Sequence, residues 1–295
     1  MPKTVVIRNE KSGRSRLANT WPEIHYDLQS KIGNFDYWQT AHHGHATELA
    51  KQAIDQGFER IIAVGGDGTI TQTANGLIGH DVTFGVIPSG TGNDLCRTLG
   101  MGASPEKAVA AIAQGKTTQM DVGHWQTNQA EGYFLNIAGM GFDAAVADRI
   151  NQGFRNLRGT AAYLAAVLAT LRSYRPKELQ LTLDGQIIQE EIMLAAIANA
   201  RCYGGGMQVA PMASISDSML DIILVKRLSK LSFLKAFPTV FKGAHIGHPA
   251  VETYRARTIR LDPQGTSPFL IDGELTPCQW AEIQILPAAL KIIVP

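Results

Sequence analysis

The sequence predicts an α/β N-terminal domain with a mostly parallel sheet, followed by a C-terminal β-sandwich domain with helical insertions. Three observations support this. The chain of 295 residues is long for one compact domain. Short β-rich runs alternate with helical patterns up to about Asp121, and beyond Asp121-Val122-Gly123 the helical patterns nearly stop. We therefore divide the chain into residues 1–122 and 123–295, and expect the active site in the cleft between the domains.

The first domain is expected to alternate strands with helices. Apolar β-branched runs bounded by turn residues predict buried strands, and apolar residues at helical spacing predict helices. The expected strands are Val5–Ile7, Arg60–Val64 and Phe84–Ile87, and the expected helices are Ala46–Gln56, Ile70–Ile78 and Pro105–Gln114. Such alternation predicts a parallel sheet covered by helices.

The second domain is expected to be mostly strands. They are Gly132–Ala138, Glu178–Leu183, Glu191–Asn199, Leu220–Lys226, Thr258–Asp262 and two runs at the C-terminus. Asp184-Gly185 predicts a tight hairpin between its flanking strands, because both residues tolerate positive φ. Two helical patterns interrupt the strands, at Ala161–Leu171 and near Ser229–Phe241.

Composition excludes several classes of protein. Hydrophobic residues make up 45% of the chain and charged residues 18%, which is typical of a fully folded protein. The net charge of +1 gives no electrostatic reason to expect nucleic acid as a partner. Cys96, Cys202 and Cys278 are odd in number and widely spaced, so we expect reduced thiols in a cytoplasmic protein. The run Thr4–Ile7 leaves no room for a signal peptide, and Ala161–Leu171 is far short of the ~20 residues that span a bilayer.

The most informative motif runs from Ile61 to Thr69, where an apolar strand enters a glycine-rich turn and then a helix. Gly65, Gly66 and Gly68 let the backbone turn sharply and bring N–H groups close to an anion, and the helix N-terminus adds its dipole. Phosphate is the ligand that suits this arrangement. The alternative is a plain strand-to-helix loop, but turn chemistry explains Asp67 poorly. Asp67 suits a Mg²⁺-binding or hydrogen-bonding role beside the phosphates.

A second glycine-rich motif, PSGTGND at residues 88–94, follows the next predicted strand. It should therefore lie at the same edge of the sheet, where open α/β sheets bind ligands. Two polar glycine loops at one edge predict a nucleotide site. Asn93-Asp94 can alternatively cap the helix that follows, and Asp94 can do so in addition to binding.

Together, GGDGT and PSGTGND resemble the catalytic domain of diacylglycerol kinases, sphingosine kinases and related bacterial lipid kinases. GGDGT alone also occurs in NAD kinases, whereas the pair is specific. The resemblance covers nearly the whole chain, through Asn136–Asp143, Asp217–Asp221 and Asp272–Glu274. It implies an ATP- and Mg²⁺-dependent kinase that phosphorylates a hydroxyl of a membrane lipid such as diacylglycerol.

The resemblance also implies the residues of the nucleotide site. Asn9 and the Lys11-Ser12-Gly13 turn would form the first phosphate-side loop, and Thr40 would contact the nucleotide after the second strand. The other ATP-site residues implied are Gly65, Gly66, Asp67, Gly68, Thr69, Ile70, Thr71, Thr91, Asn93 and Asp94.

In the second domain, the resemblance implies a metal site and a general base. Asp217 would hold Mg²⁺ with the side chain of Ser214 and the backbone carbonyl of Met219. Glu274 would be the base that a lipid hydroxyl needs in order to lose its proton. The remaining members of the catalytic set would be Asp67 and Asp272. The alternatives are a solvated turn at Asp217 and a hairpin turn at Asp272.

The chain departs from the family pattern in two places on the nucleotide side. Asn9-Glu10 stands where Asn-Pro is usual, and Thr71-Gln72 where Asn-Glu is common. These departures bear on nucleotide affinity or donor choice more than on reaction type. His42, His43 and His45 have no carboxylate or cysteine partner at metal spacing, and we interpret them as surface loop residues.

Two other functions are consistent with parts of the sequence. An NAD kinase would share GGDGT and a β-rich second domain, but residues 89–94 and the terminal Asp-Gly-Glu favour a lipid kinase. A non-catalytic nucleotide- or lipid-binding protein of the same fold would not need a base at Glu274.

The stretch 226–248 is the candidate membrane contact. It contains basic residues and no acid, interleaved with leucines and phenylalanines at spacings that fit one helical face. That face can simply pack on the second domain, or it can lie at the cleft mouth and attract anionic head groups. The second interpretation predicts a cytoplasmic enzyme that visits the membrane surface to reach its lipid. No oligomeric state is predicted.

Overall fold

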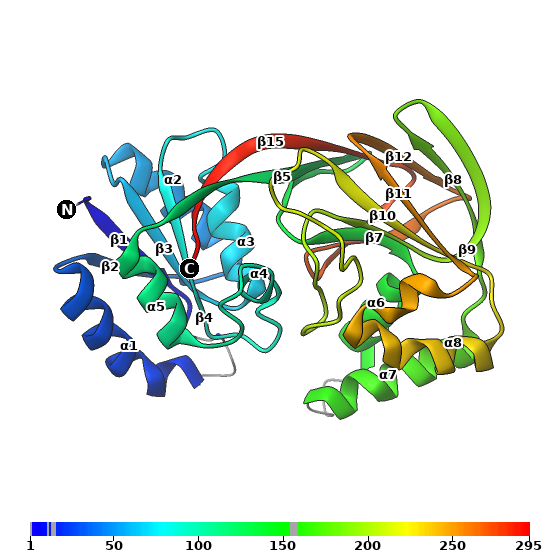
Figure 1. The fold of residues 1–295 in the computed structure, drawn as a ribbon, viewed down its shortest axis with the longest axis horizontal. Coiled ribbons are helices and arrows are strands. Elements are labelled where there is room, and N and C mark those ends of the chain that lie inside the picture. The colour runs from blue at the N-terminus through cyan, green and yellow to red at the C-terminus, as the bar shows by residue number, and fades with distance from the viewer. Residues whose placement is uncertain (1, 11, 13–15, 154–158) are drawn as a thin grey trace.

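The computed structural model describes residues 2–10, 12, 16–153 and 159–295, and it confirms the predicted fold class (Figure 1). An α/β domain with parallel strands is joined to a β-sandwich-like domain that carries its own helices. Of the helices in the described part of the chain, none is both long and apolar enough to cross a membrane.

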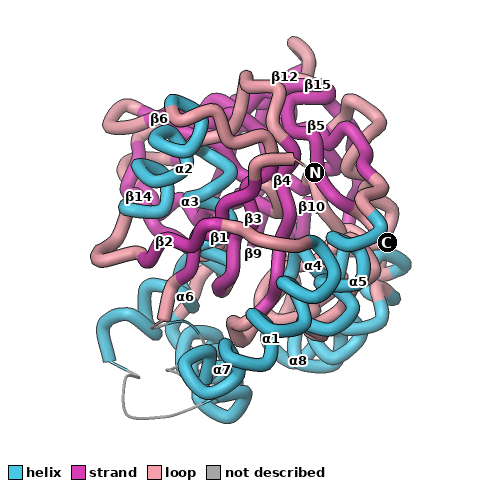
Figure 2. The backbone as a smooth tube through the Cα atoms, turned by 90° about the vertical axis from the view of Figure 1, so that its left-hand side faces the viewer, coloured by secondary structure: helices cyan, strands magenta, loops and turns pink. Residues whose placement is uncertain are grey.

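The first domain is a parallel sheet with helices on both faces. Strands lie in the order β4-β3-β1-β2, and each neighbouring pair is parallel. Helix α1 packs against α5 on one face, and α2 packs against α3 on the other (Figure 2). The elements are β1 (Thr4–Arg8), α1 (Arg16–Ile32), β2 (Asp36–Gln39), α2 (His45–Asp55), β3 (Arg60–Gly65), α3 (Asp67–Asn75), β4 (Thr83–Pro88), α4 (Asp94–Thr98) and α5 (Pro105–Gln114).

The central strands are the ones that the sequence predicts. Every residue of β1 and β3 is buried, as is β4 beyond Thr83, which is why these strands are continuous apolar runs in the sequence. The predicted helices correspond to α2, α3 and α5, although α3 begins earlier, at Asp67. Because the strands are parallel, the loops that follow β1, β3 and β4 lie at one edge of the sheet.

Helix α1 and strand β2 are not among the expected elements. Pro22 lies inside α1, and a proline weakens a helical pattern because it removes a backbone donor. The helix is nevertheless amphipathic, with Trp21, Ile24 and Leu28 buried at helical spacing. Strand β2 is a short edge strand with mostly exposed residues, so it has no apolar run to mark it.

The second domain is built mainly from antiparallel strands, with α-helices and 3₁₀-helices among them. Its elements are β5 (Thr117–Thr127), β6 (Glu131–Phe134), β7 (Ile137–Gly141), α6 (Phe142–Gly153), α7 (Gly159–Ser173), β8 (Lys177–Leu183), β9 (Gln186–Ala198), β10 (Leu220–Lys226), α8 (Lys230–Ala236), η2 (Phe237–Lys242), η3 (Ala244–Gly247), β11 (Val251–Ala256), β12 (Thr258–Pro263), β13 (Ser267–Ile271), β14 (Glu274–Cys278) and β15 (Ala281–Ile293). The predicted hairpin joins β8 to β9, with Asp184 at φ 46° and Gly185 at φ 90°.

The stretch from Ser229 to Phe241 is helical, as expected, but it is not one continuous α-helix. Ser229 caps α8 by accepting a hydrogen bond from the backbone N–H of Ser232, and α8 ends at Ala236. The chain continues as the 3₁₀-helix η2, with Pro238 in its first turn. Proline has no N–H to donate to the preceding turn, which explains the end of the α-helix there.

Strand β15 joins the two domains. It pairs with β12 and β5 in the second domain, then extends to pair in parallel with β4, through Lys291 opposite Thr83 and Ile292 opposite Phe84 (Figure 1). Leu290 and Ile292 are buried in the core of the first domain. The end of the chain therefore completes the first domain, which the division at residue 122, within β5, does not anticipate.

This pairing predicts that a substitution close to the C-terminus destabilises the first domain. Ile292→Ala removes a fully buried side chain and should lower the free energy of unfolding by about 2–5 kcal/mol. Ile187→Ala, at an exposed position on β9, is the matched control and should change it by less than about 0.5 kcal/mol. Urea unfolding measures both. Equal effects would show that the last strand does not contribute to the core.

Candidate active site

The turn after β3 leaves no room for a side chain at Gly65. A Cβ on Gly65 would lie 2.5 Å from Cβ of Thr69, one turn into α3. Asn9, at the end of β1, donates from Nδ2 to Oγ1 of the same threonine at 3.0 Å. The first loop, the glycine turn and α3 are thus packed closely at the sheet edge.

The two glycine loops lie against each other, as the sequence predicts. A Cβ on Gly90 would lie 2.6 Å from Cα of Gly66, so the two backbones meet with no room for a side chain. Ser89 strengthens this contact, because its N–H donates to the carbonyl of Gly65 at 2.8 Å and its hydroxyl to that of Ser12 at 3.1 Å.

Asp67 holds the second loop in place. Its Oδ2 accepts from the N–H of Asn93 at 2.8 Å, and its Oδ1 from the N–H of Asp94 at 2.7 Å. The side chain of Asn93 closes the loop on itself, with Oδ1 accepting from the N–H of Gly90 and Nδ2 donating to its carbonyl. Asn93 occupies the N-cap position of α4 without a capping hydrogen bond from its side chain.

Asp94 links the second loop to the other domain. Its carboxylate accepts from the N–H of Gly206 at 2.8 Å and from that of Gly205 at 3.1 Å. These donors follow β9, more than a hundred residues further along the chain. Burial raises the pKa of Asp94 to about 6, and the charge of Asp67 adds to the increase. Asp94 therefore does not cap α4 but joins the domains.

A polar pocket lies beside these loops and contains residues of both domains. Of the residues predicted for the nucleotide site, it is lined by Asn9, Thr40, Gly66, Gly68 and Thr69, together with Ser12. Glu274, the predicted base, lines the same pocket from the second domain. The structure thus brings the predicted base and the glycine turn to one site.

Other predicted nucleotide residues lie around this pocket. Ile70 is fully buried in the first core, and Thr91 is exposed in the second loop. Thr71 faces the second domain, where its hydroxyl donates to Asp272. The prediction for Gly13, and for Lys11 beside it, falls outside the described residues.

Asp272 anchors the turn that carries the base. Its carboxylate accepts from the hydroxyl of Thr71 at 2.9 Å and from the N–H groups of Leu135, Asn136 and Ile137 at 2.8 to 3.1 Å. Burial raises its pKa. Asp272, at φ 45°, and Gly273, at φ 92°, form a tight hairpin turn between β13 and β14, as the structural alternative predicted. The turn therefore places Glu274 rather than excluding it from the site.

Glu274 is half exposed and faces the first domain. Its Oε1 is 2.9 Å from Nε2 of His43 and accepts from Nε2 of Gln72 at 3.4 Å. His43 lies at the surface, as expected, with 77% of its side chain exposed. The expectation that it has no carboxylate partner was wrong, because Glu274, 231 residues away in sequence, provides one. The departure Thr71-Gln72 bears on the contact between the domains, since Thr71 reaches Asp272 and Gln72 reaches Glu274.

The neighbouring histidines also have a carboxylate partner. Gly44, at φ 83°, turns the chain so that the rings of His42 and His45 stack, with centroids 4.7 Å apart. Their ligand atoms and a carboxylate oxygen of Glu48 lie within 4.8 Å of one another. The statement that these histidines lack a partner at metal spacing was thus wrong. Nδ1 of His45 accepts from the N–H of Ala41, so that nitrogen is already engaged.

The predicted metal residues lie apart from the pocket, at the start of β10. Asp217 forms an ion pair with Arg255 and accepts from the N–H of Met219 at 3.2 Å. Arg255 also approaches Asp221, a buried acid whose pKa is raised by burial. The donor types, a carboxylate, the Ser214 hydroxyl and a backbone carbonyl, suit Mg²⁺. A cation there would take the place of the arginine as the partner of Asp217.

A second cavity, inside the second domain, is almost entirely apolar. It lies between β9, β10, α6 and the segment formed by α8 and η2. Phe142 and Val146 line it from α6, and Phe233, Phe237 and Val240 line it from the other side. A polar group stands at its wall, where the hydroxyl of Tyr203 donates to Asp143 at 3.4 Å. Burial raises the pKa of Asp143 to about 6.

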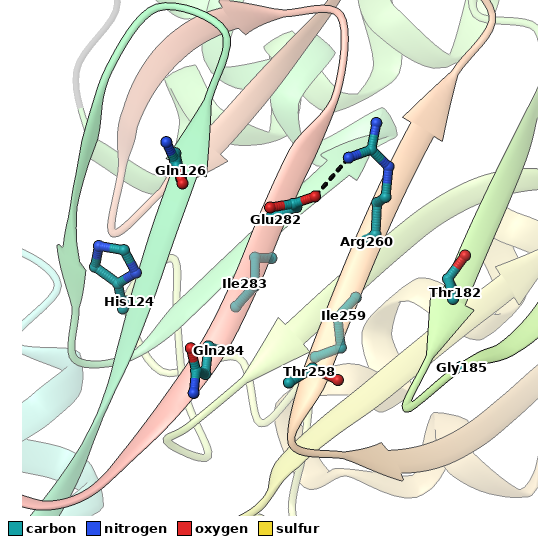
Figure 3. Close-up of a pocket in the computed structure, with 10 residues that line it drawn as sticks. All are labelled: His124, Gln126, Thr182, Gly185, Thr258, Ile259, Arg260, Glu282, Ile283 and Gln284. Carbon is teal, nitrogen blue, oxygen red and sulfur yellow. Dashed lines mark hydrogen bonds and ion pairs between the residues drawn. The ribbon is translucent and has the colours of Figure 1, made fainter.

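A third depression covers the outer face of β5, β15, β12 and β8 (Figure 3). Its side chains are mainly polar, and Arg260 pairs with Glu282 across it. It contains none of the predicted site residues, so it has no part in the site described above.

Comparisons with known proteins match both domains. The family model described as the diacylglycerol kinase catalytic domain matches residues 3–125, and the one described as the YegS C-terminal NAD kinase beta sandwich-like domain matches residues 136–294. A diacylglycerol kinase of Mycobacterium tuberculosis is 38% identical over 253 residues, or 85% of this chain and 81% of the relative. One of Bacillus subtilis is 31% identical over 278 residues, or 93% of this chain and 90% of the relative. A diacylglycerol kinase crystal structure from Bacillus anthracis has a TM-score of 0.76 at 22% identity, covering 100% of this chain and 97% of that one.

The raised pKa of Asp94 predicts how stability changes with pH. Its value in the folded protein is about 6, against an ordinary 3.8, so the folded state binds the proton more tightly than the unfolded state. The stability that protonation supplies is fully present below about pH 4 and is lost as pH rises through about 6. A difference of about two pKa units between the folded and unfolded states corresponds to about 3 kcal/mol in the free energy of unfolding.

Urea unfolding of the wild type and Asp94→Asn at pH 4 and pH 7 tests this. Between pH 4 and pH 7, the free energy of unfolding of the wild type should fall by about 3 kcal/mol relative to that of Asp94→Asn. Asp55→Asn, which removes an exposed carboxylate, is the control. A difference between wild type and Asp94→Asn that does not change with pH would contradict the assignment.

Proposed function

This chain belongs to the diacylglycerol kinase family and is a lipid kinase, and from this premise we propose that it transfers the γ-phosphate of ATP, with Mg²⁺, to a hydroxyl of a membrane lipid such as diacylglycerol. The observation that carries the proposal is the shared pocket, in which Glu274 stands beside the glycine turn of Gly66 and Gly68. The two relatives described above are diacylglycerol kinases, and this similarity favours a lipid kinase over an NAD kinase.

In the proposed reaction the first domain binds the phosphates and the second supplies the base. N–H groups of the glycine turn and the N-terminus of α3 bind the phosphate oxygens, with the Asn9 amide beside them. Glu274 takes the proton of the lipid hydroxyl while the oxygen of that hydroxyl bonds to the γ-phosphorus. The bond between the γ-phosphorus and the leaving ADP breaks in the same step. Bound Mg²⁺ neutralises phosphate charge, and Ser214, Asp217 and Met219 are the residues that would hold a Mg²⁺ ion in the second domain.

The apolar cavity supports a lipid as the acceptor. Helix α6, which lines the cavity with Phe142 and Val146, packs against β13 and β14, the two strands that meet at the turn before Glu274. A cavity with this lining suits an acyl chain, because burial of apolar surface is favourable without any polar partner. A lipid with its chain in the cavity would place its head group near the base.

The outer face of α8 and η2 supports a transient contact with the membrane. Phe233 and Phe237 face inward and line the cavity, whereas Leu231, Leu234 and Phe241 are exposed. Helices α7 and α8 lie together at one end of the second domain (Figure 1). Exposed apolar residues beside the lysines at 235 and 242 are suited to an anionic bilayer surface.

Replacement of the base tests the reaction. Glu274→Gln should lower kcat for diacylglycerol phosphorylation by about 10²–10⁴-fold, because the amide cannot accept the proton. The Kd for Mg-ATP should stay within about twofold, since the glycine turn is unchanged. Glu23→Gln, at an exposed position of α1, is the control. Near-normal turnover in Glu274→Gln would remove this residue from the mechanism, and phosphorylation of NAD instead of lipid would overturn the proposed function.

A second experiment tests the membrane contact. Leu231→Ser with Leu234→Ser should weaken binding to vesicles of mixed phosphatidylglycerol and phosphatidylcholine by about tenfold or more, because each leucine would bury its side chain in the interface. Ile187→Ser removes an equally exposed apolar side chain on β9 and should leave binding unchanged. Lys230 is left in place because it donates to the carbonyl of Arg172. Equal binding by all three proteins in a sedimentation assay would leave packing as the only role of this segment.

A further inference from the structure

The carboxylate of Glu274 is held from one side only. Its Oε1 contacts Nε2 of His43 and Nε2 of Gln72, while its Oε2 accepts no hydrogen bond from the residues that the structure describes. Both partners belong to the first domain, with His43 in the loop between β2 and α2 and Gln72 on α3. One oxygen is therefore anchored across the cleft, and the other is left to accept a proton.

His43 is the closer of the two partners. An ionised carboxylate can only accept, so Nε2 of His43 carries the hydrogen in this contact. The glutamate side chain has several rotatable bonds and is half exposed, so without a partner its carboxylate would occupy several rotamers. His43 also lines the pocket of the proposed phosphate site, as Glu274 does.

Gln72 holds the histidine loop as well as the base. Its side-chain Oε1 accepts from the N–H of Gly44 at 3.0 Å, and its backbone carbonyl accepts from the hydroxyl of Thr47 at 2.7 Å. An amide can accept from the loop and donate to Glu274 at the same time.

From these contacts we propose that His43 is a positioning residue for the base, holding Glu274 from the opposite domain with Gln72 as the support of its loop. The proposal rests on the proposed function, in which Glu274 accepts the proton of the lipid hydroxyl. It assigns His43 no contact with the reacting atoms. The base is in place only when the two domains are apposed, since its partners lie across the cleft.

Steady-state kinetics of the full chain with diacylglycerol and Mg-ATP tests this. His43→Ala should lower kcat by about 10–100-fold, as expected when a reacting group is misplaced, with KM for ATP within about twofold. His43→Gln should recover most of kcat, because its amide can supply the Nε2 donor. His80→Ala, at an exposed histidine far from the contact in sequence, is the matched control and should behave as the wild type.

A double variant distinguishes a failure of the positioning role of His43 from a failure of Glu274 as the base. In the Glu274→Gln background, His43→Ala should lower kcat no further, because the two residues act as one unit. Full additivity would overturn the positioning role, as would wild-type kcat in His43→Ala. If Glu274→Gln alone keeps wild-type kcat, the proposed base fails instead. Thermal unfolding of each variant controls for misfolding, and equal loss of activity in His43→Ala and a folded His43→Gln would also contradict the proposal.

Discussion

The arrangement of this molecule depends on the close contact of two backbones, at Gly66 and Gly90. A Cβ at residue 66 would lie 3.3 Å from Cα of Gly90, and a Cβ at residue 90 would lie 2.6 Å from Cα of Gly66. Because the loops touch, the carboxylate of Asp67 can reach the N–H groups at the start of α4. This contact fixes both loops at the sheet edge, and it sets the position from which α3 begins.

Helix α3 then connects the first domain to the second along its length. Thr71 donates to Asp272, Gln72 to Glu274, and Asn75 exchanges two hydrogen bonds with the backbone of Tyr133 in β6. A helix that starts at the glycine turn and ends on the second domain holds the turn of Asp272 and Glu274 relative to that glycine turn.

What could be predicted from the sequence was local. The strands around Ile62 and Val86 are buried on both faces and are apolar throughout, and the glycine loops were expected at one sheet edge because they follow adjacent strands. The unpredicted features depend on contacts between distant segments. The partners of Asp94 and of His43 lie 111 and 231 residues away, and Ile292 returns to a domain that the chain had left. Local spacing carries no information on such pairs, so neither the contact of Asp94 with the second domain nor that of His43 with Glu274 could be predicted.

Hydrogen exchange with a non-hydrolysable Mg-ATP analogue tests most directly whether the two domains form one site through α3. The nucleotide should slow amide exchange in the glycine turn and at the start of α3, and also in the β13–β14 turn at residues 272–275, which carries Glu274 into the same pocket. The two regions should gain protection over the same range of nucleotide concentration. Protection confined to the first domain, with the turn of Asp272 and Glu274 unchanged, would contradict the account.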